Sequence, residues 1–153
     1  MYKFKTALYK ILVYPYFVKK YGVANLKFNG PNIRFSGDGK LSCGVNSYIS
    51  NNSYLNLIDG TSISIGDNVS IGHSVQIYTS THNLIDKFFN NKETLHKSDI
   101  IIGNNVIIGY NCFIGPGAII GENCVIGANC VVTENIPANT IVSLSITKKT
   151  LKK

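Results

Sequence analysis

Nine aliphatic residues recur every six positions in this chain, and that spacing constrains its fold more than any other feature. They are Ile65, Ile71 and Ile77, then Ile102, Ile108, Ile114, Ile120, Ile126 and Val132. In seven of the nine cases glycine follows directly, and the residue two places earlier is always apolar or small. An α-helix repeats near 3.6 residues and a simple strand near two, so a strict period of six fits neither.

A fixed hexapeptide repeat is typical of a parallel β-helix, in which each repeat forms one short strand and one corner. We expect the aliphatic residue to point inward, and the glycine to let the backbone turn where a Cβ would crowd the corner. No repeat can bury its apolar side alone, so the repeats must stack around one shared core. The sequence therefore predicts an all-β fold.

The chain divides into three parts. Residues 1–27 are basic and aromatic, and we expect one or two short helices there, broken at Pro15. Residues 28–147 form the β-helix. Within it, segment 83–98 does not follow the six-residue spacing, which we call the hexapeptide grid, and is expected to be an inserted loop. Residues 148–153 are a basic tail. In the irregular stretch 28–64 the expected inward residues are Ile33, Leu41, Val45, Ile49, Leu55 and Leu57.

The net charge of +7 belongs to the two ends, since residues 31–147 hold five bases against eight acids. Residues 1–27 could cap the open end of the β-helix, or lie on a membrane surface as basic amphipathic segments do. Nothing resembles a nucleic-acid-binding module. Cys112, Cys124 and Cys130 occupy inward grid positions, so we expect buried free thiols and a cytoplasmic location, at the inner face of the membrane if the N-terminus binds lipid.

The inserted loop is where we expect the chemistry, because a strict solenoid does not need it as scaffold. His82 lies at its root, directly after the third clean repeat. His73 falls at a turn position and His96 lies between loop lysines, so neither suggests a role. The three histidines are spaced by nine and fourteen residues and none is on the inward grid, which does not fit a zinc site.

Four segments carry a resemblance to a known family: IGDNV (65–69), SVQIYTSTH (74–82), IGNNV (102–106) and IGPGAIIG (114–121). Over residues 45–140 the chain resembles the maltose and galactoside O-acetyltransferases, a group of hexapeptide-repeat acyltransferases. The resemblance implies a left-handed β-helix of triangular cross-section. It also implies a homotrimer that holds acetyl-CoA between neighbouring subunits and needs no metal.

The resemblance places the family's general base on His82, which would take a proton from a sugar hydroxyl as that oxygen attacks the thioester. Imidazole can accept and return protons near neutral pH. The family's functional asparagine falls on Asn52, beside Asn51. His82 and Asn52 are thirty residues apart, which is not a multiple of an eighteen-residue coil. They should therefore lie on different faces, which meet only where two subunits pack.

Other matches to the family are less specific. Asp59 and Glu93 match acceptor-binding acids, while Gly109, Ala128 and Thr133 match positions along the pantetheine groove. Lys148 and Lys149 match basic charge near the nucleotide of CoA. The short ends favour a polysaccharide precursor as acceptor over free maltose or galactosides.

Several alternatives stay open. The chain could be an N-acetyltransferase acting on an amino sugar nucleotide or on a xenobiotic. A non-catalytic hexapeptide scaffold and a γ-class carbonic anhydrase are further options, although the former has no reason to keep His82 and the loop.

Overall fold

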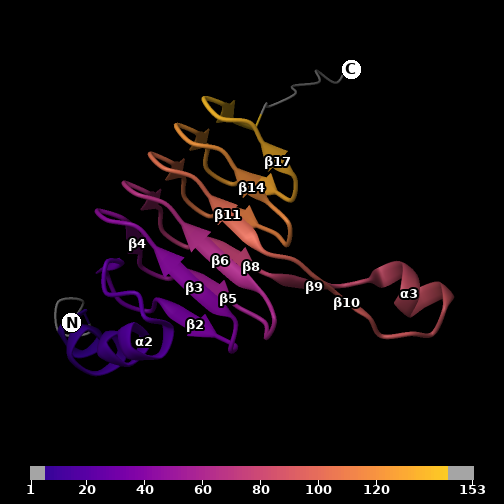
Figure 1. The fold of residues 1–153 in the computed structure, drawn as a ribbon, viewed down its shortest axis with the longest axis horizontal. Helices are drawn as coiled ribbons and strands as arrows, with labels where there is room; N and C mark the ends of the chain where they lie inside the picture. Colours follow the sequence, from indigo (N-terminus) through magenta and orange to yellow (C-terminus); the bar gives the residue numbers. More distant parts are fainter. Residues whose placement is uncertain (1–5, 145–153) are drawn as a thin grey trace, which may run out of the picture.

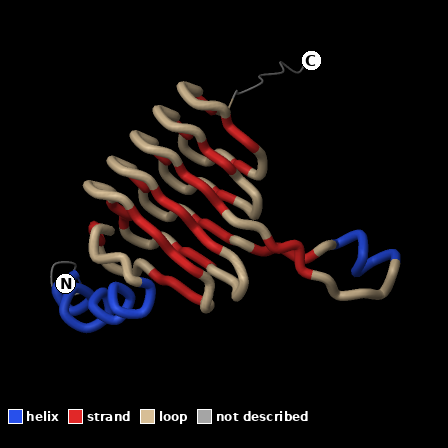
Figure 2. The backbone as a smooth tube through the Cα atoms, in the orientation of Figure 1, coloured by secondary structure: helices blue, strands red, loops and turns tan. Residues whose placement is uncertain are grey.

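Three parallel β-sheets wrap around one core in the computed structural model, which describes residues 6–144. Sheet A contains β1 (Lys27–Asn29), β4 (Tyr48–Ser50), β7 (Ser70–Ile71), β12 (Ile107–Ile108), β15 (Val125–Ile126) and β18 (Ile141–Val142). Sheet B contains β2 (Arg34–Ser36), β5 (Tyr54–Asn56), β8 (Gln76–Tyr78), β13 (Phe113–Ile114) and β16 (Val131–Val132). Sheet C contains β3 (Lys40–Cys43), β6 (Ser62–Ile65), β11 (Ile100–Ile102), β14 (Ile119–Ile120) and β17 (Asn135–Ile136). The chain visits the sheets in turn, so coils stack along one axis (Figure 1, Figure 2).

The hexapeptide grid forms the core, as predicted: all nine aliphatic residues of the grid are at most 4% exposed. Partners in successive coils keep the same inward position; for example, Ile114 pairs with Ile77 on one side and Val132 on the other. Of the six inward residues expected in 28–64, five are buried. The exception is Val45, which is 51% exposed.

Val45 is exposed because it lies in the turn between β3 and β4, where its N–H donates to Asp67 Oδ1 at 2.7 Å. The inward position of this repeat belongs to Ser47, which is fully buried. The Ser47 hydroxyl donates to Gly66 O and accepts from Val69 N–H, which makes its burial tolerable. The prediction failed there because the inward side chain is polar.

Most corners of two kinds are turned by asparagine, and one, between β7 and β8, is turned by Ser74. At the AB corner, between sheets A and B, Asn32, Asn52, Asn111 and Asn129 have positive φ; at the CA corner, Asn46, Asn68, Asn105, Asn123 and Asn139 do. Asparagine tolerates this left-handed conformation better than other residues with a Cβ. The grid glycines have a different role, since a Cβ on Gly103 would lie 2.7 Å from Glu122 N of the next coil. The close approach of the coils thus requires glycine, as expected, but the prediction that the grid glycines let the backbone turn is wrong, since none of them has a positive φ.

The N-terminal segment covers the first coil. A π-helical turn, η1 (Tyr9–Val13), leads directly into α2 (Tyr14–Tyr21), and Pro15 lies in the first turn of α2. The chain is helical on both sides of Pro15, so the break expected there is wrong. Tyr14, Phe17 and Tyr21 are buried, and the Phe17 ring lies 4.8 Å from that of Phe35 on β2. Neither helical stretch within residues 6–144 has the length and apolarity to cross a bilayer.

The inserted segment is an ordered arm. Strands β9 (Ser80–His82) and β10 (Leu95–Lys97) pair antiparallel, and α3 (Leu84–Phe89) lies beyond them, away from the β-helix (Figure 1). The segment expected as a loop thus contains secondary structure. The arm leaves the stacking of the coils intact, because Ile65 still pairs with Ile102 across it.

Candidate active site

The site residues predicted from the sequence lie at the two opposite ends of the strands of sheet B. Asn52 lies at the AB corner, between β4 and β5, whereas His82 lies beyond β8, where the chain leaves sheet B toward sheet C. We call this end of the sheet B strands the BC corner. A single chain therefore does not bring His82 and Asn52 together at one corner.

His82 ends β9, and its exposed side chain lies opposite Leu95 of β10. Asn83, the next residue, caps α3 by accepting from the N–H groups of Ile85 and Asp86. The root of the arm is anchored by Thr79, which is fully buried and accepts hydrogen bonds from Ile58 N–H and the Thr61 hydroxyl. The imidazole of His82 is thus exposed to solvent, while the root of the arm that carries it is anchored to the β-helix.

Asn52 lines a pocket of about 330 Å³ with Tyr9, Asn32 and Arg34. Its Oδ1 accepts from Asn32 Nδ2 at 3.1 Å, while its own Nδ2 donates no hydrogen bond to the residues that the structure describes. Its φ of 61° gives it a structural role as well, because it turns the corner. The adjacent Asn51 has a buried Oδ1 that accepts no hydrogen bond from the described residues.

Arg34 belongs to this pocket but carried no signal in the sequence. Its guanidinium lies 5.2 Å from the centre of the Tyr54 ring, and no carboxylate of residues 6–144 forms an ion pair with it. The Tyr54 hydroxyl is 2.6 Å from Ser36 Oγ, and hydrogen bonds with Ser36 and Asn56 hold the pKa of Tyr54 below its ordinary value. The pocket therefore presents a fixed positive charge and amide donors.

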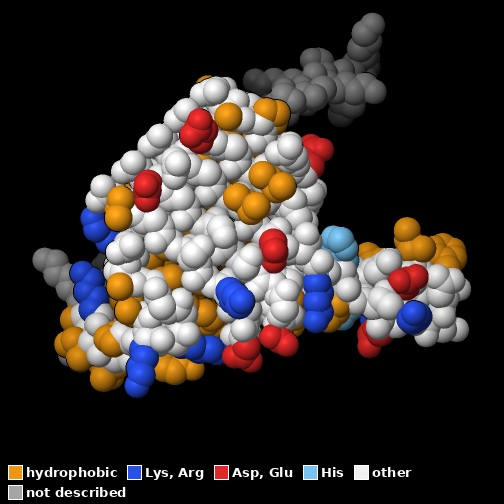
Figure 3. All heavy atoms as spheres, viewed as in Figure 1, with side chains coloured by type: hydrophobic (Ala, Val, Ile, Leu, Met, Phe, Trp, Pro, Cys, Tyr) orange, Lys and Arg blue, Asp and Glu red, His pale blue; other side chains and the backbone are white. Residues whose placement is uncertain are grey.

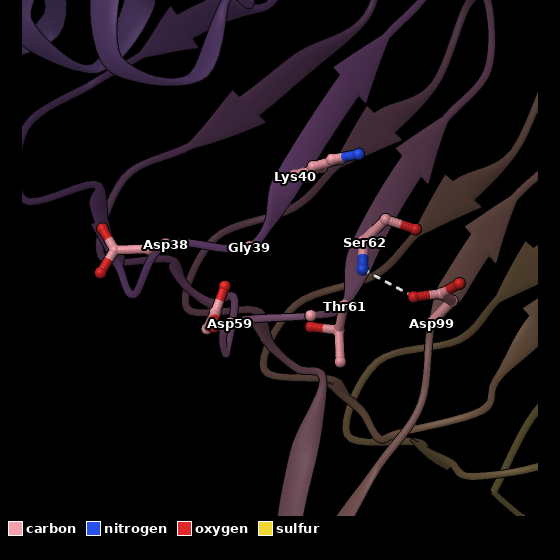
Figure 4. A pocket seen from close by; sticks show the side chains of 8 residues that line it. Asp38, Gly39, Lys40, Asp59, Thr61, Ser62 and Asp99 are labelled. Atoms are coloured by element: carbon pink, nitrogen blue, oxygen red, sulfur yellow. Dashed lines mark hydrogen bonds between the residues drawn. The ribbon is translucent and has the colours of Figure 1, made fainter.

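Asp59 lines a second pocket, of about 290 Å³, at the BC corner near the root of the arm (Figure 4). Asp38, Lys40 and Asp99 line it too, from the coils before and after. Asp99 Oδ1 accepts from Ser62 N–H at 2.6 Å, which fixes that carboxylate. The sequence identified only Asp59, because Asp38 and Asp99 join it through the stacking of coils.

Glu93 lies apart from Asp59, in the segment of the arm that follows α3. Its carboxylate forms an exposed ion pair with Lys87 Nζ at 3.1 Å. It lines a shallow pocket with Lys87, Asn91 and Lys92, and neither His82 nor Asp59 contributes to that pocket. Within one chain, Glu93 is thus a residue of the arm surface.

The expected cofactor positions are also divided between the two corners. Gly109 and Ala128 stack at the AB corner, where a Cβ on Gly109 would lie 2.7 Å from Ala128 N. Thr133 follows β16 at the BC corner, beside Gly115 of the coil before. Lys148 and Lys149 lie outside the described residues. The AB corner thus carries Asn52, Gly109 and Ala128, and the BC corner carries His82, Asp59 and Thr133.

The outward surface of sheet B, which joins the two corners, carries an aromatic row that the sequence analysis missed. Ring centres of Tyr54 and Tyr78 are 5.5 Å apart, and those of Tyr78 and Phe113 are 5.6 Å apart. Partial burial raises the pKa of Tyr78. Within residues 6–144 no group of three His, Cys, Asp or Glu side chains is placed to hold a metal ion.

Comparisons with known proteins identify the family. The family model described as bacterial transferase hexapeptide (six repeats) matches residues 99–134. The structure of a hexapeptide-repeat-containing acetyltransferase from Vibrio cholerae is 30% identical, with a TM-score of 0.65, and the match covers 84% of this chain and 72% of that one. The chain belongs to the hexapeptide-repeat acetyltransferases. It is an acyltransferase, and its three-sheet stack is the left-handed parallel β-helix of that family, as predicted.

Two further solved structures contain the cofactor. An acetyltransferase from Vibrio cholerae O1 biovar eltor complexed with acetyl-CoA is 30% identical, with a TM-score of 0.63; the match covers 86% of this chain and 71% of that one. A galactoside acetyltransferase in complex with CoA is 34% identical, with a TM-score of 0.61; the match covers 78% of this chain and 60% of that one. A search of curated protein sequences gave no significant match.

Proposed function

We propose that this hexapeptide-repeat acetyltransferase transfers acetyl from acetyl-CoA to a hydroxyl of a sugar, in sites shared between the subunits of a homotrimer. The division of site residues between the AB and BC corners carries this proposal. A cyclic trimer repeats one heterologous contact three times, so the AB corner of one subunit can face the BC corner of the next. That contact would bring Asn52, Gly109 and Ala128 of one subunit opposite His82 and Thr133 of its neighbour.

The AB corner suits the pantetheine part of acetyl-CoA. A Cβ on Gly109 would lie 2.7 Å from Ala128 N, so no side chain at position 109 fits between the two coils. Ala128 is exposed and Gly109 is half-buried, so this ridge lies at the surface. A long, narrow ligand can lie on such a ridge and exchange hydrogen bonds with backbone groups. Acetyl-CoA would supply an activated acetyl group there, so the chain itself needs no nucleophilic residue.

His82 would act as general base. It takes the proton of the acceptor hydroxyl as that oxygen attacks the thioester carbonyl carbon, and it returns the proton to the sulfur of CoA as the carbon–sulfur bond breaks. The Asn52 amide, from the neighbouring subunit, would donate to the acceptor or to the oxyanion that forms. Positioning of the two substrates supplies much of the remaining acceleration.

The acceptor would lie between the Asn52 pocket of one subunit and the Asp59 pocket of the next. Arg34 and Asn52 supply positive charge and amide donors, which fit a phosphorylated sugar. Asp59 and Asp99 supply acceptors for sugar hydroxyls. A charged polysaccharide precursor satisfies both pockets better than neutral maltose or a galactoside does.

The experiment is a screen of acetyl-CoA turnover against nucleotide sugars, neutral oligosaccharides and amino sugars, with mass detection of the product. Ester formation on a nucleotide sugar supports the proposal. Turnover confined to neutral sugars overturns the role of Arg34.

One observation favours N-acetylation of an amino sugar nucleotide as a second candidate. The three carboxylates of Asp38, Asp59 and Asp99 in one pocket would attract an amino group. In the same screen an amide product, stable to mild base that cleaves esters, would support this candidate over O-acetylation.

A further inference from the structure

The N-terminal helical stretch has a second apolar surface that plays no part in covering the β-helix. Leu8, Ile11, Leu12 and Tyr16 are 45%, 72%, 64% and 59% exposed. We call these four residues the N-terminal apolar face. Their spacing of three, one and four places them along one side of the helical stretch.

The contacts with the core are made by the opposite side. Tyr14, Phe17 and Tyr21 are buried, and Tyr9 and Val13 pack against the core. The stretch therefore covers the β-helix without the N-terminal apolar face. A contiguous group of large exposed apolar side chains is typical of an interaction surface.

Charge around this face identifies the occupant. From residue 6 to residue 37 the chain has five basic residues, Lys10, Lys19, Lys20, Lys27 and Arg34, and the first acidic residue is Asp38. Lys20 pairs with Asp38 at 2.9 Å, which leaves the other four without a carboxylate partner among residues 6–144. Figure 3 shows hydrophobic and basic side chains gathered at the end of the molecule where α2 lies.

The arm provides an informative comparison. Its tip also exposes apolar side chains, with Ile85, Phe88 and Phe89 each at least 68% exposed. Acidic residues accompany them, because Asp86 lies within α3 and Glu93 follows it. The arm as a whole holds three bases, Lys87, Lys92 and Lys97, against these two acids, whereas residues 6–37 hold five bases and no acid. The apolar exposure of the N-terminal face is thus accompanied by a larger positive charge that no acidic residue of its own segment opposes.

We propose that the N-terminal apolar face docks on an anionic lipid bilayer. Leu8, Ile11 and Leu12 enter the boundary between headgroups and acyl chains, as the apolar side of an interfacial helix does. Lys10 and Lys19 contact lipid phosphates, and each lysine near such a surface strengthens binding about fivefold. Covering the β-helix and binding a membrane are thus functions of two sides of one helical stretch, not alternatives.

Docking has a consequence for the acetyltransferase site. Tyr9, which follows Leu8, lines the pocket that also contains Asn52 and Arg34. The pocket would therefore lie beside the bilayer, within reach of an acceptor sugar attached to a lipid phosphate. This consequence rests on the proposed function, whereas the docking itself does not.

Co-sedimentation with vesicles tests the docking independently of catalysis. The full chain should bind vesicles of phosphatidylcholine with phosphatidylglycerol at low salt, release at high salt and ignore pure phosphatidylcholine. Ile11→Ser with Leu12→Ser, and separately Lys10→Gln with Lys19→Gln, should each lower the partition coefficient by roughly tenfold or more. Unchanged melting temperatures would verify that the fold is intact.

The arm supplies matched controls. Ile85→Ser with Phe88→Ser, and Lys92→Gln with Lys97→Gln, should leave vesicle binding unchanged. Absence of binding at low salt, or an equal loss in the arm variants, would overturn the proposal. So would sedimentation velocity showing association of trimers that only the Ile11→Ser, Leu12→Ser variant abolishes, since the face would then bind a second copy of the chain.

Discussion

His82 and Asn52 lie at opposite ends of the same pair of hydrogen-bonded strands. β5 begins two residues after Asn52, β8 ends four residues before His82, and Tyr54 of β5 pairs in register with Gln76 of β8. Within one chain, the two residues are therefore separated by at least the length of a strand of sheet B. Chemistry that needs both must draw them from two chains.

Removal of the His82 imidazole should lower kcat by about 10²–10⁴-fold, the usual effect of losing a general base, with little change in KM for acetyl-CoA. Steady-state kinetics of His82→Ala on the acceptor found by the screen will measure this. His96→Ala is the matched control, since His96 belongs to the same hairpin, opposite Thr81. Near-normal turnover of His82→Ala would refute its assignment as general base.

Mixed oligomers should recover activity that neither parent has. Asn52→Gly removes the amide yet keeps the positive φ of the corner, so it is a cleaner change than alanine. When inactive His82→Ala and inactive Asn52→Gly chains are unfolded together and refolded, roughly a quarter of the shared sites should be intact.

Asn129→Gly controls for the turn itself. Asn129 also turns the AB corner and accepts from Asn111 Nδ2 at 2.9 Å, but lies three coils away from Asn52. This variant should retain activity. Failure of the two inactive chains to complement each other, with trimers confirmed by sedimentation, would contradict a shared site.

Gly103→Ala should destabilise the fold by about 1–3 kcal/mol, because its Cβ has no space between two coils. Ile101→Ala is the control, since Ile101 on the preceding strand is 46% exposed and its loss leaves no cavity. Urea denaturation followed by circular dichroism will give both free energies of unfolding. Equal effects would mean that the coils are not packed at this distance.

The four cysteines should react slowly in the folded protein. All are free; Cys112, Cys124 and Cys130 are buried, and burial raises the pKa of the half-buried Cys43 to about 11. Little thiolate then exists at pH 8, and thiolate is the reactive species. Iodoacetamide labelling followed by mass spectrometry should modify four thiols only after unfolding, and rapid labelling of the native protein would contradict this.

The ionised carboxylate of Asp86 should stabilise the structure of the arm over most of the pH range. Hydrogen bonds from Thr94 and then Asn90 hold the pKa of its carboxyl below the usual value. A depressed pKa means that this contribution is present above about pH 4 and is lost as pH falls through the lowered pKa. Hydrogen exchange of peptides from 80–97 should speed up in Asp86→Asn at neutral pH, without a change in global melting temperature.

An equal exchange rate in Asp86→Asn and the parent protein would show that interactions other than those of Asp86 stabilise the arm. The exposed ion pair of Lys87 with Glu93 provides the comparison, because exposed pairs contribute little. Lys87→Gln should therefore leave exchange nearly unchanged.

The stacked strands could be predicted because period six is a local property, written into each repeat from Ile100 to Val132. The separation of His82 from Asn52 was also expected, but from an eighteen-residue coil, whereas Tyr54 pairs with Gln76, twenty-two residues on. In the first coils counting fails, because Arg34 pairs with Tyr54 and Lys40 with Ser62, twenty and twenty-two residues on, instead of eighteen. Val45 was wrongly expected inside because the inward residue of its repeat, Ser47, is polar.

Contacts that depend on those irregular coils could not be predicted. Arg34 over Tyr54, and Asp38 and Asp99 around Asp59, are juxtapositions between neighbouring coils that no local motif encodes. The insertion at 83–98 was expected, but its secondary structure was not, since its short strands and α3 have no repeat to reveal them. The asparagine corners were missed because the turns were assigned to glycine, although Asn68, Asn105 and Asn123 each lie two places after a grid glycine.

The arm joins β8 to β11 without changing the register of the coils, since Ile63 still pairs with Ile100 and Ile77 still pairs with Ile114. The cost of closing a loop rises only slowly with its length, so the scaffold tolerates arms of very different size at this junction. The length and sequence of the arm can therefore change while the pairing of the coils on either side of it stays the same.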